Sequence, residues 1–414
     1  MIERDQILRK IENMKNIAES ILKDLVSIPT VNPPGEKYLE FCNYVKELLS
    51  KYGISSKIIK VPDEYVRKHI PEYVEYPRYI LIANVGSGDR VLHLNGHYDV
   101  VPPGTGWTIT DPFKPVIIDD KLYGRGSDDM KGGITSAILT LLALKDFENI
   151  LNGRVEIALV PDEEIGGITG TGYLVREMKV RPNFVIVCEP TGLDKIVIGN
   201  KGLIWLIVEI FGKQAHAATP WLGVNAFEIG IKFLNKIIDE LKSRVESVVS
   251  KYEYDIEGGN KATIVFGGDV KSCGKINMVT GYFSFSIDRR VIPEENVDDV
   301  EQELYNYLYS KAREMNIQIN IKTVQKSSPA IVNPNVELVK TLEKSIKDIL
   351  NIDVRKVVCT GGLDTRYYQE VGIQAVTYGP GDVNVAHKAD EYVRLKDVVD
   401  ASKIYVDIAL RLLR

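Results

Sequence analysis

Strand-like and helical segments alternate along much of this chain, and the alternation constrains its fold more than any other feature. Before residue 200, strands are expected at about 79–85, 90–95, 155–160 and 184–188, and helices at about 130–147 and 170–178. After residue 334, helices are expected at about 335–349 and 396–413, and strands at 354–358 and 374–378. Alternation of this kind predicts an α/β fold with a mostly parallel sheet, whose functional side chains lie at the carboxyl ends of the strands.

A second, smaller domain interrupts this alternation. From residue 200 the predicted elements follow the β-α-β-β-α-β order of the ferredoxin-like split unit. They are Leu203–Phe211, Asn225–Val248, Ala262–Phe266, Gly281–Asp288, Asn296–Met315 and Ile317–Val324. The stretch Gln325–Pro334 is rich in Ser, Pro and Asn and predicts a linker. We therefore expect a discontinuous larger domain at 1–199 and 327–414, and an inserted α+β domain at 200–326.

The first residues predict a helix and no targeting segment. Six apolar residues recur at spacings of three and four, in a stripe that ends before Pro29: Ile7, Ile11, Met14, Ala18, Ile21 and Leu25. Met1–Asp5 lacks the apolar region of a signal peptide, and no uninterrupted apolar run reaches the ~18 residues of a membrane span. We expect a cytoplasmic protein.

Length and composition exclude several partners. At 414 residues the chain exceeds the size at which a single core stops growing, so two domains are expected. Its net charge of −5 gives no basic surplus of the kind that binds nucleic acid or anionic membrane. The four cysteines lie far apart and predict buried thiols rather than disulfides: Cys42, Cys188, Cys273 and Cys359.

A histidine and a carboxylate follow the apolar strand at 90–95. His97 and Asp99 stand two residues apart, so in an extended segment their side chains share a face. One can bind a cation while the other accepts the second N–H of the imidazole ring and fixes its orientation. Alone, such a pair is more often an ordinary hydrogen-bonded pair than a metal site.

Three acidic clusters and a late histidine occupy similar positions. Asp128 and Asp129 follow a glycine-rich turn and precede a helix, where either could equally act as an N-terminal cap. Glu163 and Glu164 follow the strand at 155–160. Neighbouring side chains in an extended segment face opposite ways, so one could bind a cation and the other a water molecule. Acidic loops are, however, usually only solvated.

Two further residues complete the pattern. Glu189 directly follows an almost wholly apolar strand. Burying a carboxylate there is unfavourable unless it is paired with another group or bound to a metal ion. His387 lies in a glycine-rich loop beyond the strand at 374–378.

Together these residues resemble the di-zinc amidohydrolase family that includes acetylornithine deacetylase, succinyl-diaminopimelate desuccinylase, aminoacylase and the glutamate carboxypeptidases. The resemblance covers nearly the whole chain, because the motifs occur in the family's order. They are Gly-His-x-Asp-Val-Val-Pro, Gly-Arg-Gly-x-x-Asp-Met-Lys-Gly-Gly, Asp-Glu-Glu-x-Gly, Glu-Pro-Thr and a late Ala-His.

The resemblance implies a role for each residue. His97 and Glu189 would hold one metal ion, Glu164 and His387 the other, and Asp129 would bridge the two. The ions would be two divalent cations per chain, Zn²⁺ with Co²⁺ as the alternative.

The resemblance also implies roles for two acidic residues that do not bind metal. Asp99 would orient His97, and Glu163 would be the general base. Position within the motif selects Asp129 over Asp128 as the bridging residue. Glu189, where part of the family has Asp, resembles the deacetylase and desuccinylase branch.

The inserted domain carries matching residues. His216, in a Gly-x-x-Ala-His-Ala motif, would bind the oxyanion of the tetrahedral intermediate. Asn277 and Arg290 would contact substrate, with Arg289 as the alternative to Arg290, and the loop at Gly362 would receive the carboxylate of the substrate. In this family the small domain acts as a lid and commonly pairs two chains, so the resemblance implies a homodimer. The ordinary interpretations are a histidine hydrogen-bonded within its own loop for His216, a turn for Asn277, an ion pair of Asp288 with Arg290, and a strand-to-helix turn at Gly361 and Gly362.

These assignments predict a zinc-dependent hydrolase that cleaves the amide bond of N-acyl amino acids. Zn²⁺ activates water at neutral pH and a metal pair polarises the carbonyl, while Glu163 would take a proton from the water and pass it to the departing amine. A di-zinc dipeptidase or carboxypeptidase is the nearest alternative.

The sequence argues against a nucleotide-dependent protein and against a non-catalytic binding protein. The loop Gly166–Gly172 lacks the order of a phosphate-binding motif and follows two glutamates, which would repel phosphate. A non-catalytic binding protein on the same fold is expected to lose a ligand or the base, and both are present here.

Overall fold

The computed structural model describes residues 2–272 and 274–414, so Cys273 lies outside the described residues. The chain divides into two compact units. The first unit consists of the chain up to Ile198 together with Val332–Val357 and Leu363–Arg414, and the second of Gly199–Ile331 and Val358–Gly362. Among the described residues, no helix is both long and apolar enough to cross a membrane.

A mixed sheet with a parallel centre organises the first unit. Its strand order is β1-β2-β6-β3-β7-β17-β8, and β16 also pairs with β8. The two-residue strand β15 pairs with Gly199 and Asn200 at the end of β8, and these residues belong to the second unit. The neighbours β6, β3, β7 and β17 are parallel, whereas β1, β2 and β8 pair antiparallel at the flanks. The strands are β1 (Ser56–Lys60), β2 (Tyr79–Gly86), β3 (Val91–His97), β6 (Arg154–Val160), β7 (Phe184–Val187), β8 (Lys195–Asn200), β15 (Ala330–Ile331), β16 (Arg355–Cys359) and β17 (Gln374–Thr377). The mostly parallel α/β prediction is confirmed for the centre of the sheet.

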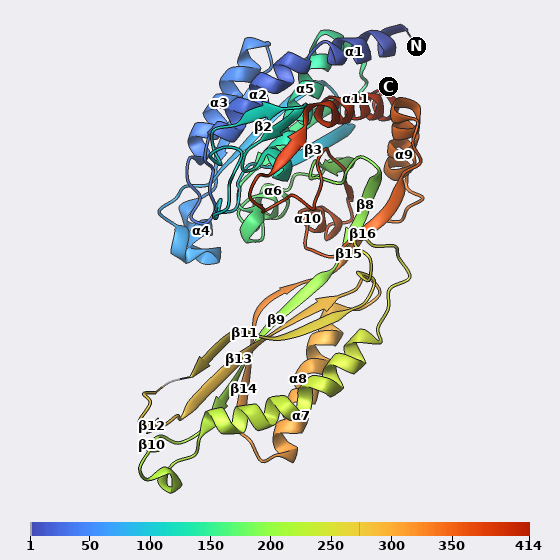
Figure 1. Ribbon diagram of the computed structural model, residues 1–414. Coiled ribbons are helices and arrows are strands. Elements are labelled where there is room, and N and C mark those ends of the chain that lie inside the picture. The colour runs from blue at the N-terminus through green and yellow to red at the C-terminus, as the bar shows by residue number, and fades with distance from the viewer. Residues whose placement is uncertain (1, 273) are drawn as a thin grey trace. The chain divides into compact units, whose positions relative to one another are not determined.

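Helices cover both faces of this sheet. Figure 1 shows α2, α5 and α11 on one side and α6 and α10 on the other. Each residue of α5 is buried, because a helix that is apolar on all sides must be enclosed on all sides. The helices are α1 (Ile2–Glu12), α2 (Lys15–Ser27), α3 (Tyr38–Lys51), α4 (Asp63–His69), α5 (Gly132–Leu144), α6 (Thr171–Arg176), α9 (Glu337–Leu350), α10 (Thr365–Gln369) and α11 (Leu395–Leu412). A small sheet joins β4 (Val116–Ile118), β5 (Lys121–Tyr123) and β18 (Tyr392–Arg394).

Two local predictions were wrong. The predicted single N-terminal helix is two helices. The N–H of Met14 donates to the carbonyl of Ile11, three residues back instead of the four of an α-helix, and α2 begins directly after it. The predicted linker Gln325–Pro334 is partly strand, because β14 (Ile319–Ser327) extends into it and β15 pairs with β8. Polar residues are compatible with β14 because it is an edge strand of its sheet.

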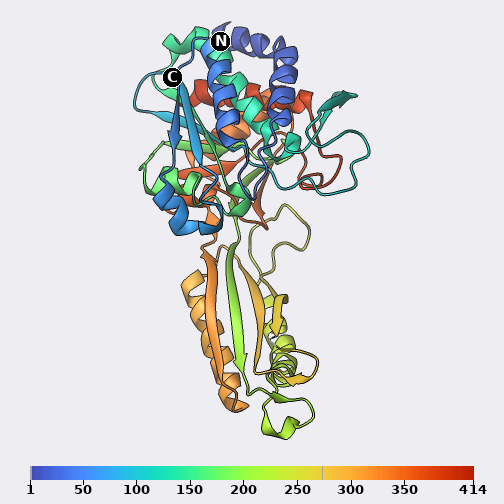
Figure 2. The same cartoon turned by 90° about the vertical axis from the view of Figure 1, so that its left-hand side faces the viewer.

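The second unit is a four-stranded antiparallel sheet with two helices. Its order is β11-β13-β9-β14, built from β9 (Gly202–Phe211), β11 (Thr263–Ser272), β13 (Tyr282–Val291) and β14 (Ile319–Ser327). Figure 1 shows α7 (Ala226–Glu246) and α8 (Val297–Glu314) on one face of this sheet, and Figure 2 shows the sheet from its other face. Two short strands, β10 (Ala215–His216) and β12 (Met278–Val279), pair with each other.

The core of this unit follows the strand alternation. Inward residues such as Ile204, Leu206 and Val208 are buried, and the helices cover them. The unit therefore has its own core.

Candidate active site

Five of the predicted site residues meet near the carboxyl ends of the central parallel strands. His97 is the last residue of β3, Glu164 follows β6, and Glu189 follows β7. Asp129 lies in the turn before α5, and His387 lies in the loop after β17. Parallel strands end on the same edge of the sheet, so residues far apart in sequence converge here.

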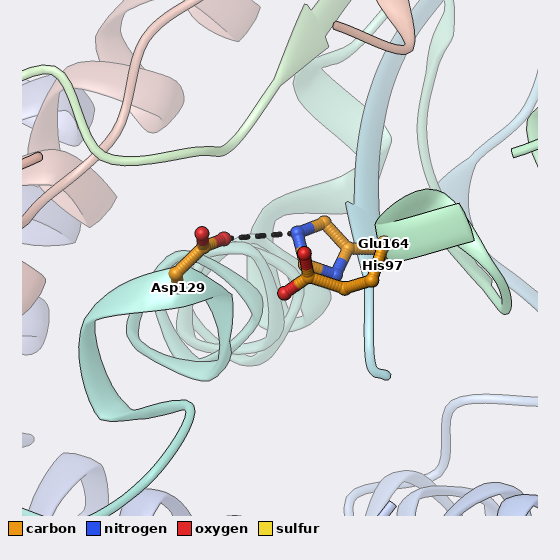
Figure 3. A group of neighbouring side chains, drawn as sticks. All are labelled: His97, Asp129 and Glu164. Carbon is orange, nitrogen blue, oxygen red and sulfur yellow. Dashed lines mark hydrogen bonds and ion pairs between the residues drawn. The ribbon is translucent and has the colours of Figure 1, made fainter. Parts of the chain in front are cut away.

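Asp129 lies between two histidines. Its Oδ1 is 3.0 Å from Nε2 of His97, and its Oδ2 is 3.2 Å from Nε2 of His387. The same nitrogen of His387 is 3.2 Å from Oε2 of Glu164. Figure 3 shows the ring of His97 directed at Asp129, with the carboxylate of Glu164 beside it. Asp128, the alternative to Asp129, instead accepts a hydrogen bond from the backbone N–H of Asp382 at 2.7 Å.

Two groups of side chains offer a cation several ligand atoms at once. One consists of His97, Asp129 and Glu164, and the other of His97, Glu163 and Glu189; within each group the ligand atoms lie within 4.8 Å of one another. In the described part of the chain, Oε1 of Glu164 and Oε1 of Glu189 are buried without a hydrogen-bond partner. Imidazole nitrogens and carboxylate oxygens are ligands that Zn²⁺ takes, so the residues fit a divalent metal.

The electrostatics of the cluster also favour bound cations. Burial and the charge of Glu189 raise the pKa of Glu163 well above its usual value, and burial raises the pKa of Glu189 to about 8. Hydrogen bonds to Asp129 and Glu164 raise the pKa of His387 to about 10. Carboxylates this crowded repel one another when ionised, and divalent ions would remove that repulsion.

Asp99 contacts both His97 and the turn that carries Glu163 and Glu164. Its main-chain carbonyl is the acceptor for Nδ1 of His97 at 3.0 Å, while its carboxylate Oδ1 lies 3.5 Å from that nitrogen. The carboxylate accepts the backbone N–H groups of Glu163 and Glu164, each at 3.2 Å. Asp99 therefore anchors the segment with the two glutamates as well as the ring of His97.

Glu163 and Glu164 do not lie in an extended segment, as the sequence argument assumed. They begin a short 3₁₀ turn, Glu163–Ile165. The two side chains nonetheless join different groups, Glu163 with Glu189 and Glu164 with Asp129. The turn separates them as an extended chain would have done.

A buried ion pair near the site was not predicted. Glu391 accepts the backbone N–H of Asp129 at 3.1 Å, and its carboxylate pairs with the guanidinium of Arg125. Arg125 also donates to the main-chain carbonyl of His387 at 3.2 Å. Arg125 lies in the glycine-rich motif, and a charged residue in a turn expected to be buried could have indicated a buried partner. No local feature of the sequence around Glu391 indicates this ion pair.

The second unit holds the other predicted residues. His216 is exposed and pairs with Met278 across β10 and β12, and the main-chain carbonyl of Asn277 accepts the N–H of Ala217. Nδ1 of His216 accepts the N–H of Ala218 at 3.0 Å, so the proton of a neutral ring is on Nε2. His216 and Asn277 therefore lie close together.

Arg289 and Arg290 point to opposite faces of the sheet of the second unit. Arg290 is half-buried and binds Asp288 through two hydrogen bonds of 2.9 and 3.0 Å. Arg289 is buried on the face that the helices cover and pairs with Glu295. Gly362 is half-buried at the end of the segment Val358–Gly362.

Comparison with known proteins identifies the family. Residues 93–411 match the model of peptidase family M20/M25/M40. The chain belongs to this family. It is therefore a metallohydrolase, and the predicted resemblance is confirmed.

Relatives of this M20 enzyme cover nearly its full length. An uncharacterized metallohydrolase of Methanocaldococcus jannaschii is 30% identical, over 93% of this chain and 97% of the relative. A protein of Nautilia profundicola named succinyl-diaminopimelate desuccinylase is 27% identical, over 94% of this chain and 97% of the relative. Among solved structures, an M20 family metallo-carboxypeptidase from Sulfolobus solfataricus shares the fold with a TM-score of 0.71 at 20% identity, over 95% and 99% of the two chains.

Proposed function

We propose that this M20 metallohydrolase cleaves the amide bond of N-acyl amino acids at a site that binds two divalent metal ions, Zn²⁺ or alternatively Co²⁺. The observation that carries the proposal is the position of Asp129, between the nitrogens of His97 and His387 at 3.0 and 3.2 Å. A carboxylate with an imidazole on each oxygen is suited to bridge two ions. His97 and Glu189 would hold one ion, and Glu164 and His387 the other.

The protein residues would divide the reaction between them. A bound pair of Zn²⁺ ions would activate a water molecule and polarise the carbonyl of the scissile bond. Glu163 would accept a proton from the attacking water and deliver it to the nitrogen of the departing amine. Burial and the charge of Glu189 raise the pKa of Glu163, so this carboxylate is more basic than a solvated one before any metal binds.

His216 would stabilise the oxyanion. Its Nε2–H is a donor because Nδ1 already accepts the N–H of Ala218. His216 belongs to the second unit and all proposed metal ligands belong to the first, so it would reach them by closure of its own chain or from a second chain. We propose the second route, a homodimer in which His216 completes the site of the partner subunit.

The substrate would be an N-acyl amino acid, as for acetylornithine deacetylase or succinyl-diaminopimelate desuccinylase. The relative named a desuccinylase supports this class, and so does Glu189 in its motif. Asn277, Arg290 and the loop at Gly362 would contact the substrate. We propose no nucleic acid or membrane partner, and a cytoplasmic location.

A dipeptidase or carboxypeptidase is the second candidate, because a solved structure named a metallo-carboxypeptidase has the same fold. A panel of N-acetyl amino acids, N-succinyl amino acids and dipeptides, incubated with the zinc-loaded protein, separates the two candidates by kcat/KM. Hydrolysis of dipeptides alone would favour the second. No hydrolysis of any amide, with stoichiometric metal bound, would contradict both.

A further inference from the structure

We propose that Arg78 and Asp162 form a positioning pair that holds the general base Glu163 in place, and that residues 62–77 serve to anchor this pair. The inference rests on the proposed role of Glu163. The segment 62–77 is rich in Tyr, Glu and Pro and carries no predicted site residue.

Asp162 directly precedes Glu163 and starts its turn. Its main-chain carbonyl accepts the N–H groups of Ile165 and Gly167, so its conformation sets the path of the backbone through the two glutamates. Its φ of 69° is in the left-handed region, which Asp tolerates better than most residues. Any movement of Asp162 therefore moves Glu163.

The side chain of Asp162 is held by four donors. Oδ2 accepts Nε of Arg78 at 2.7 Å and the hydroxyl of Thr169. Oδ1 accepts the hydroxyl of Tyr38 at 2.9 Å and Nδ2 of Asn32 at 3.1 Å. The same nitrogen of Asn32 donates to Oδ2 of Asp99 at 2.8 Å. One amide therefore links Asp162, which precedes Glu163, to Asp99, which accepts the N–H groups of both glutamates.

Arg78 ties this carboxylate to the segment. The side chains of Arg78 and Asp162 are both 0% exposed. Beyond the ion pair, the guanidinium donates to the main-chain carbonyls of Tyr73 and Pro34, each at 2.9 Å, and to that of Tyr76. A planar group with five donors can make these contacts at once, and an ammonium group cannot match that geometry.

An apolar cluster supplies an independent second contact. Val66 and Ile70 of the segment are buried together with Val160, the last residue of β6. Ile165 and Ile168, from the loop after the glutamates, pack against this same cluster. The segment is therefore linked to the loop with Glu163 in two ways, by apolar packing and through the hydrogen bonds of Arg78.

Two variants test the pair. The double variant Arg78→Met with Asp162→Asn removes both charges and leaves no unpaired buried ion, so folding is expected to persist. Arg78→Lys keeps the positive charge but loses the planar set of donors. The matched control is the exposed pair Arg90 and Glu337, changed to Met and Gln.

The expected result is a loss of kcat with unchanged KM. Because the same turn carries Glu164, metal content is measured in parallel and kcat is compared at saturating Zn²⁺. A misplacement of about 1 Å can cost about 100-fold in rate, so we expect a fall of about that size in the double variant and a smaller one for Arg78→Lys. Hydrogen exchange in residues 162–170 should become faster in both variants and stay unchanged in the control. The exchange measurement reads the position of the loop independently of any substrate.

The outcomes separate the two hypotheses. Wild-type kcat or unaltered exchange in the double variant overturns the positioning pair. If that variant does not fold, the same two readouts on Arg78→Lys decide. If instead Glu163→Gln keeps full turnover, the proposed base is wrong, whatever the Arg78 variants do.

Discussion

The backbone N–H of Glu163 donates to the carboxylate of Asp99 over 3.2 Å. This bond joins the segment that follows His97, the last residue of β3, to the turn after β6 that carries Glu163 and Glu164. Nδ1 of His97, by contrast, is closer to the main-chain carbonyl of Asp99, at 3.0 Å, than to its carboxylate, at 3.5 Å. The carboxylate of Asp99 therefore holds the backbone of both glutamates and the amide of Asn32 more closely than it holds the ring of His97.

Asp99→Asn tests this division. The variant keeps the main-chain carbonyl that holds the ring of His97, so the metal content should stay near that of the native protein. It replaces one of the two carboxylate acceptors by an NH₂ group, so one of the N–H groups of Glu163 and Glu164 loses its partner. We expect kcat to fall by about 100-fold through misplacement of the base. Elemental analysis beside steady-state kinetics checks it, and loss of metal as the main effect would contradict it.

Glu163 and Glu164 should respond differently to the same substitution. Glu163→Gln should lower kcat by about 100- to 10,000-fold and retain metal, because it removes a proton acceptor from an assembled site. Glu164→Gln should lower metal affinity, because Glu164 lies 3.2 Å from Nε2 of His387 beside the shared Asp129. Competition with a chelator measures the affinity. Equal metal loss in both variants would show that the roles are assigned wrongly.

Metal removal should affect stability as well as activity. The apo-protein keeps its crowded carboxylates, and a ligand that binds only the folded state stabilises it by mass action. We expect two equivalents of metal per chain, a lower Tm after chelation, and recovery of both Tm and amide hydrolysis when Zn²⁺ or Co²⁺ is restored. Full activity in chelator, with no stoichiometric metal, would contradict the proposal.

Much of the fold, and the convergence of the candidate ligands at one edge of the sheet, could be predicted from local sequence. Apolar runs that end in His97, or just before Glu164 and Glu189, indicate strand ends, and strand ends of a parallel sheet meet. Breaks in a helix are harder to predict. Met14 is buried between α1 and α2, so it fits the apolar stripe equally well with one continuous helix or with two.

The contacts that support the site could not be predicted in this way. Arg78 and Asp162 are 84 positions apart, and Arg125 and Glu391 are 266 apart. No periodicity relates such residues, since only the tertiary fold brings them together. A charged residue between apolar neighbours signals that a partner exists but not which one.

Asp407 gives a prediction on acid stability. Its burial favours the neutral form, but hydrogen bonds from Arg4 and Arg411, at 2.5 and 2.6 Å, outweigh burial and hold its pKa below the usual value. A lowered pKa means that the folded state binds the proton less readily than the unfolded state. This stabilisation is therefore present above the usual Asp pKa and is lost as the pH falls through the lowered value.

Asp407→Asn should therefore lower Tm at pH 7 and flatten its dependence on pH in the acid range. A charge-assisted bond contributes about 2 kcal/mol, so a drop of several degrees is expected. Thermal melts between pH 3 and 7 measure it. Asp5→Asn is the matched control, because Asp5 lies 3.7 Å from the same Arg4 but is 61% exposed. Equal shifts in both variants would rule out the buried pair as the cause.

His216 provides the test of the homodimer. It lies in the second unit, and the proposed ligands all lie in the first, so a role in the partner subunit predicts complementation between two inactive chains. His216→Ala lacks the oxyanion donor, and Glu163→Gln lacks the base. In a hybrid of the two with two-fold symmetry, one site receives both groups intact, so activity should recover to about half of the wild-type value. A mixture that has exchanged subunits fully, shown by mass spectrometry of the dimers, and that stays inactive would exclude the role in the partner subunit. The control is a mixture of Glu163→Gln with Glu164→Gln, both in the first unit, whose hybrid sites each keep one defect and should remain inactive.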